Sequence, residues 1–246
     1  MNKLTLLNFL TVLKCPSCDE IFELGKEGNG VLCRNCNSKF EEERQRTCNY
    51  CGMSAQNCRC IPKNIKSAGC NTFVKITFYD PNSDGVTEKI ILHQKDYKNR
   101  YLSKFFANKM VAALISAVPD ISDTDMNHVM ITYAPRSKKA LNEKGFDQAE
   151  IIAGFCAKKL KCRFAKLIKR TYFSKQQKNL DVSERTENAK RSFKLKNINI
   201  TDISTVIIVD DIVTTGSSLS ACVNLLKQAG VEQVICLAVA QTNKKG

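Results

Sequence analysis

The fold is decided by the stretch Val206-Ile207-Ile208-Val209-Asp210-Asp211-Ile212-Val213-Thr214-Thr215-Gly216-Ser217-Ser218. Its first four residues are fully apolar, which is typical of a strand that is buried on both faces of a parallel sheet. The segment from Ser217 to Gln228 has helical spacing, and Gly230 follows as a residue that commonly ends helices. A short apolar strand that leads through a polar turn into a helix predicts an α/β fold with a parallel sheet.

Residues 63–246 continue this alternation of strands and helices, so we expect one sheet covered by helices on both faces. The further predicted strands lie at 73–79, 128–133 and 234–239. The further predicted helices lie at 146–159 and within 87–118, where a break falls near Lys98-Asn99. We therefore expect a parallel-sheet domain at 63–246 and a small amino-terminal module at 1–62.

The two carboxylates that follow the apolar strand indicate a ligand site. Ligands of open parallel sheets bind beyond the carboxyl ends of the strands, where Asp210 and Asp211 are expected. Adjacent carboxylates repel each other unless hydroxyl groups or a cation lie beside them, and a ribose diol with Mg²⁺ nearby meets that need. The hydroxyl-rich turn from Thr214 to Ser218 opens a helix, whose N–H groups favour an anion. This order of groups matches ribose 5-phosphate.

All thirteen quoted positions match the signature with which phosphoribosyltransferases bind phosphoribosyl pyrophosphate. The resemblance implies that Asp210 and Asp211 hold the ribose hydroxyls. It also implies that the loop after the strand at 128–133 clasps pyrophosphate, where Lys138 and Lys139 could add charge, although a solvated loop is an alternative. The residues implied for the phosphate and pyrophosphate groups are Thr214, Thr215, Gly216, Ser217, Ser218, Pro135, Arg136 and Ser137.

The thirteen cysteines are concentrated near the amino terminus, with nine of them between residues 15 and 70. Eight form close pairs, which favours structural zinc in a reducing compartment such as the cytoplasm over disulfides. Four-cysteine sites have no open coordination position and therefore hold structural rather than catalytic metal. Two zinc ions are expected, one zinc is the alternative, and both sequential and interleaved pairing stay open. The ligands are Cys15, Cys18, Cys33, Cys36, Cys48, Cys51, Cys58 and Cys60.

A second motif narrows the resemblance to one family. Lys144-Gly145-Phe146-Asp147-Gln148 resembles the Arg-Gly-Phe-Asn-Gln element of the ComF family, from which Lys144 and Asp147 depart. The region Lys95-Asp96-Tyr97 also resembles this family. ComF proteins combine an amino-terminal zinc ribbon with a phosphoribosyltransferase-like domain, so the resemblance implies natural competence and the DNA-uptake machinery as the setting. Further matching positions are Arg170, Thr171, Gln177, Leu180, Arg185, Asn188 and Phe193.

The positive charge of the chain is concentrated in one band. The net charge is +14, and residues 161–196 hold twelve Lys and Arg against three acids, a local charge of +9. Such a band favours phosphate-rich partners, although a solvated basic face is an equal alternative. The first hypothesis is a phosphoribosyltransferase with an unassigned acceptor, and the second is a non-catalytic accessory protein that binds single-stranded DNA. Candidates to line an acceptor or DNA groove, or else to form a polar network, are Gln148, Arg170, Gln177, Arg185 and Asn188.

The sequence contains no apolar run that is long enough to cross a bilayer, so we expect no membrane insertion. The amino-terminal segment Met1 to Leu13 lacks a small-residue cleavage site and is interpreted as a short helix or strand rather than a signal peptide. His93 and His128 have no metal-ligand spacing and receive no role. The cytoplasm is the expected location.

Overall fold

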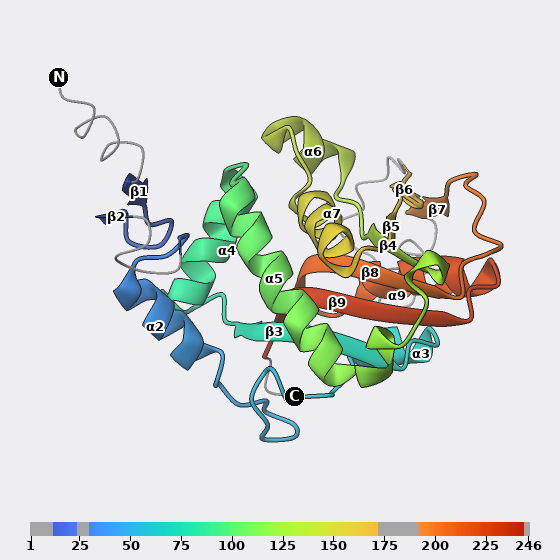
Figure 1. Cartoon of the computed structure of the whole chain (residues 1–246), viewed down its shortest axis with the longest axis horizontal. Coiled ribbons are helices and arrows are strands. Elements are labelled where there is room, and N and C mark those ends of the chain that lie inside the picture. Colours follow the sequence, from blue (N-terminus) through green and yellow to red (C-terminus); the bar gives the residue numbers. More distant parts are fainter. Residues whose placement is uncertain (1–11, 24–29, 172–191, 244–246) are drawn as a thin grey trace, which may run out of the picture.

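The computed structural model describes residues 12–23, 30–171 and 192–243, and its centre is a five-stranded sheet (Figure 1). The strand order is β3-β9-β8-β4-β5, and every neighbouring pair is parallel. The strands are β3 (Thr72–Tyr79), β4 (Val129–Tyr133), β5 (Arg163–Phe164), β8 (Thr205–Val213) and β9 (Gln233–Thr242). The predicted α/β fold with a parallel sheet is confirmed.

Helices cover both faces of the sheet, which explains why the central strands are apolar along their whole length. Ile207 and Val209 pack against α4 (Val86–Asp96), α5 (Arg100–Ala117) and α7 (Gln148–Leu160). Val206 and Ile208 point to the other face, where α3 (Lys63–Ser67) and α9 (Ser217–Gln228) lie. Because successive side chains of a strand alternate between the faces, both sets are fully buried.

Two features of the carboxyl edge differ from the sequence-based expectation. The strand β8 continues to Val213 because β9 pairs with it as far as Val213 opposite Gln241, whereas its pairing with β4 ends at Val209. Asp210 and Asp211 therefore belong to a strand but lie beyond the end of its neighbour β4. The loop expected after β4 contains the short helix α6 (Lys138–Lys144), which Ser137 caps by accepting a hydrogen bond from the Ala140 N–H at 3.2 Å.

The smaller elements lie around this sheet. A hairpin of β1 (Val12–Lys14) and β2 (Ile21–Glu23) precedes the helix α2 (Arg34–Glu43). A second hairpin pairs β6 (Ile168–Arg170) with β7 (Phe193–Leu195). The remaining described elements are the two 3-10 turns η1 (Pro119–Ser122) and η2 (Met126–His128).

The amino-terminal module shares the main hydrophobic core. Phe22, Leu32 and Phe40 are buried in the same cluster as Val74 of β3 and Phe105 of α5. The rings of Phe40 and Phe105 lie 5.5 Å apart, a distance typical of a favourable aromatic contact. The module is therefore packed onto the sheet domain by apolar contact and not only joined to it by the chain.

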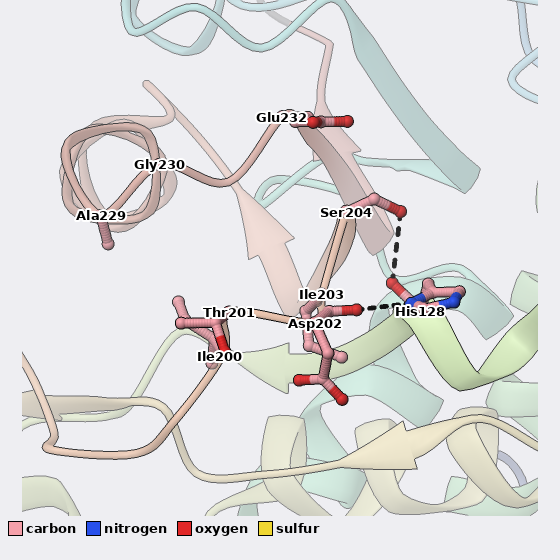
Figure 2. A pocket seen from close by; sticks show the side chains of 9 residues that line it. All are labelled: His128, Ile200, Thr201, Asp202, Ile203, Ser204, Ala229, Gly230 and Glu232. Atoms are coloured by element: carbon pink, nitrogen blue, oxygen red, sulfur yellow. Dashed lines mark hydrogen bonds between the residues drawn. The ribbon is translucent and has the colours of Figure 1, made fainter.

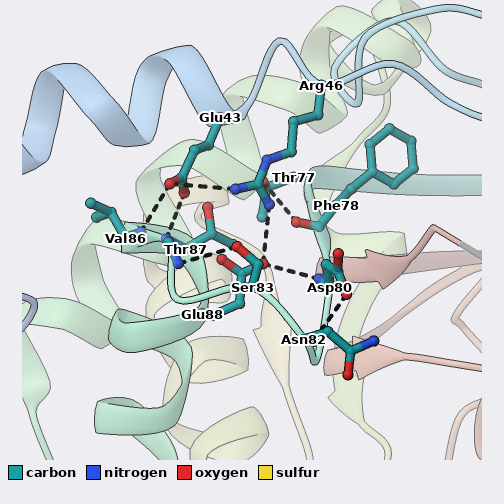
Figure 3. A network of polar contacts seen from close by, with 11 residues as sticks. Glu43, Arg46, Thr77, Phe78, Asp80, Asn82, Ser83, Val86, Thr87 and Glu88 are labelled. Carbon is teal, nitrogen blue, oxygen red and sulfur yellow. Dashed lines mark hydrogen bonds and ion pairs between the residues drawn. The ribbon is translucent and has the colours of Figure 1, made fainter.

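A polar network at the end of α2 makes a second connection to the sheet domain (Figure 3). The carboxylate of Glu43 accepts hydrogen bonds from the N–H groups of Val86 (2.9 Å) and Thr87 (2.7 Å), the first N–H groups of α4. Arg46 donates to Glu88 at 3.1 Å and lies 3.4 Å from Glu43. A carboxylate at a helix amino terminus satisfies free N–H groups and complements the helix dipole. Glu43 thus caps a helix that lies more than forty residues further along the chain.

Candidate functional site

The acidic pair Asp210 and Asp211 lies half-buried at the carboxyl edge of the sheet. Each carboxylate accepts a hydrogen bond from the next backbone N–H, Asp210 from Asp211 at 2.8 Å and Asp211 from Ile212 at 2.7 Å. Burial raises the pKa of Asp210 well above its usual value, and the charge of Asp211 raises it further. Two carboxylates in this position favour a ligand that supplies hydroxyl hydrogens or a cation.

Two side chains from separate helices contact Asp211. The Gln148 amide nitrogen, at the start of α7, donates a hydrogen bond to the Asp211 carboxylate. The ammonium of Lys95, near the end of α4, lies 4.0 Å from the same carboxylate oxygen. Gln148 is only 1% exposed, so its position favours the polar-network interpretation over an open acceptor groove.

Gln94 is a neighbour of this network that the sequence did not indicate. It is 2% exposed, and its amide nitrogen donates to the Ser103 hydroxyl at 2.7 Å. Gln94, Gln148 and Asp211 line a cavity of about 10 Å³, enough for about one water molecule. Among the described residues, neither glutamine oxygen has a hydrogen-bond donor. In the sequence Gln94 is one polar position of a helical pattern, and nothing there signals its partner.

The proposed phosphate turn follows the acidic pair and opens α9. Thr214, Thr215 and Ser217 are exposed, and the Thr215 and Ser217 hydroxyls lie 2.8 Å apart. Gly216 precedes the helix with a φ of +77°, a conformation that glycine adopts without strain. Ser218, half-buried, belongs to the first turn of α9. Free N–H groups at the start of a helix of this length are a favourable environment for a phosphate.

The candidate pyrophosphate loop starts where β4 ends, so it reaches the same edge of the sheet as Asp210. The backbone N–H of Arg136 donates to one carboxylate oxygen of Asp147 at 2.9 Å, and the other oxygen accepts from the backbone N–H of Ala149 at 3.1 Å. Burial raises the pKa of Asp147. One guanidinium nitrogen of Arg136 is buried without a hydrogen-bond partner among the described residues. A cationic donor without a partner suits a loop that meets an anionic ligand. Pro135 and Ser137 flank Arg136 and are half-buried.

The remaining basic candidates are distributed around this edge. Lys139 lies 3.9 Å from Glu143 within α6, and Lys144 donates to Asp96 at 2.6 Å. Arg170 is exposed, and its guanidinium lies over the ring of Phe193 at 5.1 Å. Three other candidates, Gln177, Arg185 and Asn188, fall outside the described residues.

A larger cavity of about 510 Å³ lies at the opposite edge of the sheet (Figure 2). The residues that line it come just before the strands β4, β8 and β9 in the chain, and they include His128, Asp202 and Glu232. The His128 ring nitrogen lies 2.6 Å from the backbone oxygen of Asp202. The wall also includes Ala229 and Gly230 at the carboxyl end of α9, where the negative end of the helix dipole disfavours a phosphate ligand. The carboxyl edge with Asp210 therefore remains the candidate site for a phosphorylated sugar.

The eight paired cysteines form two separate clusters in sequential order. One contains Cys15, Cys18, Cys33 and Cys36, the other Cys48, Cys51, Cys58 and Cys60, and all ligand sulfurs within a cluster lie within 4.8 Å of one another. Interleaved pairing is thereby excluded. The sulfurs of Cys18 and Cys33 are 3.7 Å apart, and those of Cys51 and Cys58 are 3.6 Å apart. A tetrahedral site with zinc–sulfur bonds of about 2.3 Å requires sulfur separations of about 3.8 Å. Both clusters therefore fit structural zinc.

The second cluster contacts a buried lysine that the sequence did not indicate. Lys75 lies within β3, is only 1% exposed, and its ammonium donates to the Cys58 sulfur (3.2 Å) and backbone oxygen (3.3 Å). Four thiolates around Zn²⁺ carry a net charge of about −2, which an adjacent ammonium offsets. The surrounding apolar strand residues gave no signal of this role. The cysteines outside the clusters are Cys70, Cys156, Cys222 and Cys236, which are buried, and Cys162, which is half-buried.

Known proteins resemble this chain in both its carboxyl part and its whole length. Residues 147–246 match the family model described as phosphoribosyl transferase domain. The sequence is 25% identical to Competence protein F of Haemophilus influenzae over 239 residues, which cover 93% of this chain and 96% of the relative. The chain is a ComF-like protein.

The match to the phosphoribosyltransferase model begins at Asp147, so in this ComF-like protein it contains α7, the acidic pair and the phosphate turn. The cysteine clusters, β3 and the loop at Arg136 precede it. Nowhere in residues 12–23, 30–171 and 192–243 does the ComF-like chain form a helix with the length and apolarity needed to cross a membrane.

Proposed function

We propose that this ComF-like protein binds phosphoribosyl pyrophosphate with Mg²⁺ at the carboxyl edge of its sheet and transfers the phosphoribosyl group to an acceptor. The observation that carries the proposal is the position of Asp210 and Asp211 near the end of β8, separated by two residues from a hydroxyl-rich turn at the start of α9. The two carboxylates would accept hydrogen bonds from the ribose hydroxyls. Thr215 and Ser217 would donate to the 5-phosphate together with the N–H groups of the turn.

Phosphoribosyl transfer requires little covalent chemistry from the protein. Pyrophosphate leaves the anomeric carbon, the acceptor bonds there, and the charge that develops on the leaving group must be stabilised. The Arg136 guanidinium would supply part of this stabilisation, and bound Mg²⁺ would neutralise further charge. Gln148 and Lys95 would hold the Asp211 carboxylate in the orientation that the ribose needs.

Isothermal titration with phosphoribosyl pyrophosphate and Mg²⁺ tests the ligand. The intact protein is expected to bind, and Asp210→Asn and Asp211→Asn should each weaken binding at least about tenfold because a hydrogen bond to a charged group is lost. Asp202→Asn, at the opposite edge of the sheet, is the matched control. The proposal is wrong if the intact protein does not bind, or if the three variants behave alike.

Release of pyrophosphate tests the reaction. The protein is incubated with phosphoribosyl pyrophosphate, Mg²⁺ and separate acceptors: purine and pyrimidine bases, an amine and single-stranded DNA. Acceptor-dependent release that Asp211→Asn abolishes supports an enzyme. Binding without release from any acceptor would favour the non-catalytic alternative, in which the pocket is only a ligand or phosphate site.

A second candidate function, the binding of single-stranded DNA, is supported by the β6–β7 hairpin. Lys169 and Lys194 are exposed and face each other directly across it. Like charges in directly opposite positions destabilise a hairpin, so a phosphate between them would stabilise it. Both lysines belong to the basic band at 161–196. Together with the likeness to Competence protein F, this supports a role in natural competence and DNA uptake.

Anisotropy of a labelled oligothymidylate at several salt concentrations tests this second candidate. Binding should weaken steeply with salt, and Lys194→Glu should reduce the slope of log K against log salt by about 1 to 2. Lys39→Glu, an exposed position on α2, makes the same change in net charge and is the control. Salt-independent binding, or equal effects of the two variants, would exclude a specific contribution of the hairpin.

We also propose a cytoplasmic location. Eight clustered thiols keep their metal-binding form in a reducing compartment, where disulfides do not compete with zinc for the sulfurs. The phosphorylated ligand proposed for the sheet edge is consistent with the same compartment.

A further inference from the structure

A short segment joins the second cysteine cluster to the proposed phosphate turn. Cys60 is the last ligand of that cluster, and only Ile61 and Pro62 separate it from the helix α3. This helix packs along α9, whose first turn carries the phosphate site. The segment from 61 to 65, called here the brace, therefore lies between a candidate zinc site and a candidate ligand site.

The brace contacts the phosphate turn through one hydrogen bond. The side-chain amide of Asn64 donates to the backbone oxygen of Thr215 at 3.0 Å. In a planar trans peptide the C=O and the following N–H point in opposite directions. When Asn64 holds the Thr215 oxygen on the brace side, the N–H of Gly216 points away from the brace, so a phosphate bound on the far side of the turn would accept a hydrogen bond from it.

The brace also packs tightly against Gly216. A Cβ atom at this glycine would lie 2.8 Å from Cγ1 of Ile65 and 3.3 Å from Cβ of Pro62, and Ile65 is fully buried. The positive φ of Gly216, +77°, is one reason for glycine at this position. The structure adds a second reason, since the backbone of the turn rests directly on the brace.

The other end of the brace is fixed to the sheet through the second cluster. Lys75 of β3 holds Cys58, as described above. Asn243, which follows β9, donates to the Thr47 oxygen at 2.8 Å and accepts from the Asn49 N–H at 3.1 Å. Contacts from two neighbouring strands thus hold the cluster in place, and the brace extends from it to the phosphate turn.

We propose that the second cysteine cluster orders the phosphate turn through the brace, and that Asn64 is a positioning residue for the 5-phosphate. The inference rests on the proposed ribose-phosphate site, and it assigns to the zinc module a part in forming that site. Loss of metal from the second cluster would lower the affinity for phosphorylated sugar without any change in the residues that contact the sugar.

Titration of Asn64→Ala with two separate ligands tests the positioning role. Loss of one hydrogen bond of about 0.5–1.5 kcal/mol corresponds to a twofold to thirteenfold loss of affinity for ribose 5-phosphate. Inorganic pyrophosphate, which is assigned to the loop at Arg136, should bind with unchanged affinity. Ser67→Ala, an exposed position of the same helix, should leave both affinities unchanged.

The possible outcomes separate this inference from the function on which it rests. If the unaltered protein binds neither ligand, the proposed function fails and the inference fails with it. If the unaltered protein binds ribose 5-phosphate and Asn64→Ala binds it equally well, only the inference is overturned. Equal weakening of both ligands would also overturn it, because a general loss of structure would have that effect.

Cys60→Ser tests the part played by the cluster. The zinc content should fall from two ions per chain to one, the affinity for ribose 5-phosphate should fall, and that for pyrophosphate should stay. If this variant does not fold, Lys75→Met removes only the ammonium beside Cys58 and makes the same comparison. Unchanged binding of ribose 5-phosphate by the variant with reduced zinc content would overturn the inference.

Discussion

Gln148 is the residue whose substitution best tests the support of Asp211. Gln148→Leu keeps the approximate size of the side chain but removes the donor to a half-buried carboxylate. Hydrogen bonds to charged groups contribute about 1.5–3 kcal/mol, so urea denaturation should show a decrease of this size in the free energy of unfolding. Gln228→Leu, an exposed position on α9, is the matched control. A variant as stable as the unaltered protein would show that the Asp211 carboxylate has other partners.

The stability of the protein is expected to depend on pH through the ionisation of Asp147. Burial raises the pKa of this carboxyl above the usual 3.8, and the charge of Asp211 raises it further. The folded state therefore binds the carboxyl proton of Asp147 more tightly than the unfolded state does. The stabilisation that this protonated carboxyl contributes is fully present below about pH 3.8, and it is lost as the pH rises through the raised pKa. The free energy of unfolding of the unaltered protein, minus that of Asp147→Asn, should decrease from pH 4 to pH 7. If this difference increased from pH 4 to pH 7, the pKa of Asp147 would not be raised in the folded protein. Asp123→Asn, at an exposed position, is the control.

Single residues of the candidate site differed in how well the sequence revealed them. Asp210, Asp211 and the turn that follows were found because their chemistry is written in consecutive positions. Gln94, Asn64 and Lys75 were not found, because each acts on a partner that is distant in the chain and that only tertiary packing brings near. Gln148 was found as a candidate, but burial and its contact with Asp211 changed the interpretation of what it does.

At the scale of elements, Glu43 connects α2 to the start of α4. Glu43→Ala should lower the free energy of unfolding by about 1–2 kcal/mol, because the Val86 and Thr87 N–H groups lose their acceptor. Glu42 is its neighbour on the same helix, and its carboxylate contacts only the Ser38 hydroxyl, at 3.4 Å, among the described residues, so Glu42→Ala should have a much smaller effect. Chemical denaturation of the two variants measures the difference. Equal stabilities would show that water caps α4 as well as Glu43 does.

The elements that the sequence predicted are those with a long apolar pattern. Each of these elements buries one face or both, so its apolar residues are spaced with the period of a strand or a helix. They are the strands β3, β4, β8 and β9 and the helices α4, α5, α7 and α9. The short elements α3, α6 and β5 to β7 were missed, because two to seven residues do not establish a period. The extension of β8 through Asp210 was missed because it depends on hydrogen bonding to β9, and the sequence of β8 by itself does not show where that pairing ends.

At the scale of the whole molecule, the sequence predicted two units, and we still propose a zinc-ribbon module at 1–62 and a phosphoribosyltransferase-like domain at 63–246. What the sequence could not give is how the two units pack. Cys15, Cys33, Cys36 and Phe40 share one core with residues of α4 and α5, and Lys75 and Asn243 hold the second cluster. Composition indicated a metal-dependent module, but the apolar residues at 22, 32 and 40 are too few to indicate their partners.

This shared core leads to a prediction about metal removal. If each unit had a core of its own, a zinc chelator would unfold residues 1–62 and leave the melting of the sheet domain unchanged. Because Phe40 packs on Phe105 and Glu43 caps α4, loss of the module also exposes part of the sheet domain. Calorimetry should therefore show one transition for the zinc-loaded protein. After chelation, the transition of the sheet domain itself should move to a lower temperature.

Calorimetry of Phe40→Ala separates the effect of metal binding on the melting transition from the effect of core packing. This change leaves all eight thiolates in place but removes a fully buried ring, which should cost about 3–5 kcal/mol. If the two units form one cooperative structure, zinc-loaded Phe40→Ala should still melt in a single transition, at a reduced temperature. Two separated transitions, with the upper one unchanged from the unaltered protein, would mean that the sheet domain folds independently. In that case the zinc module would contribute to the ligand site only through the brace.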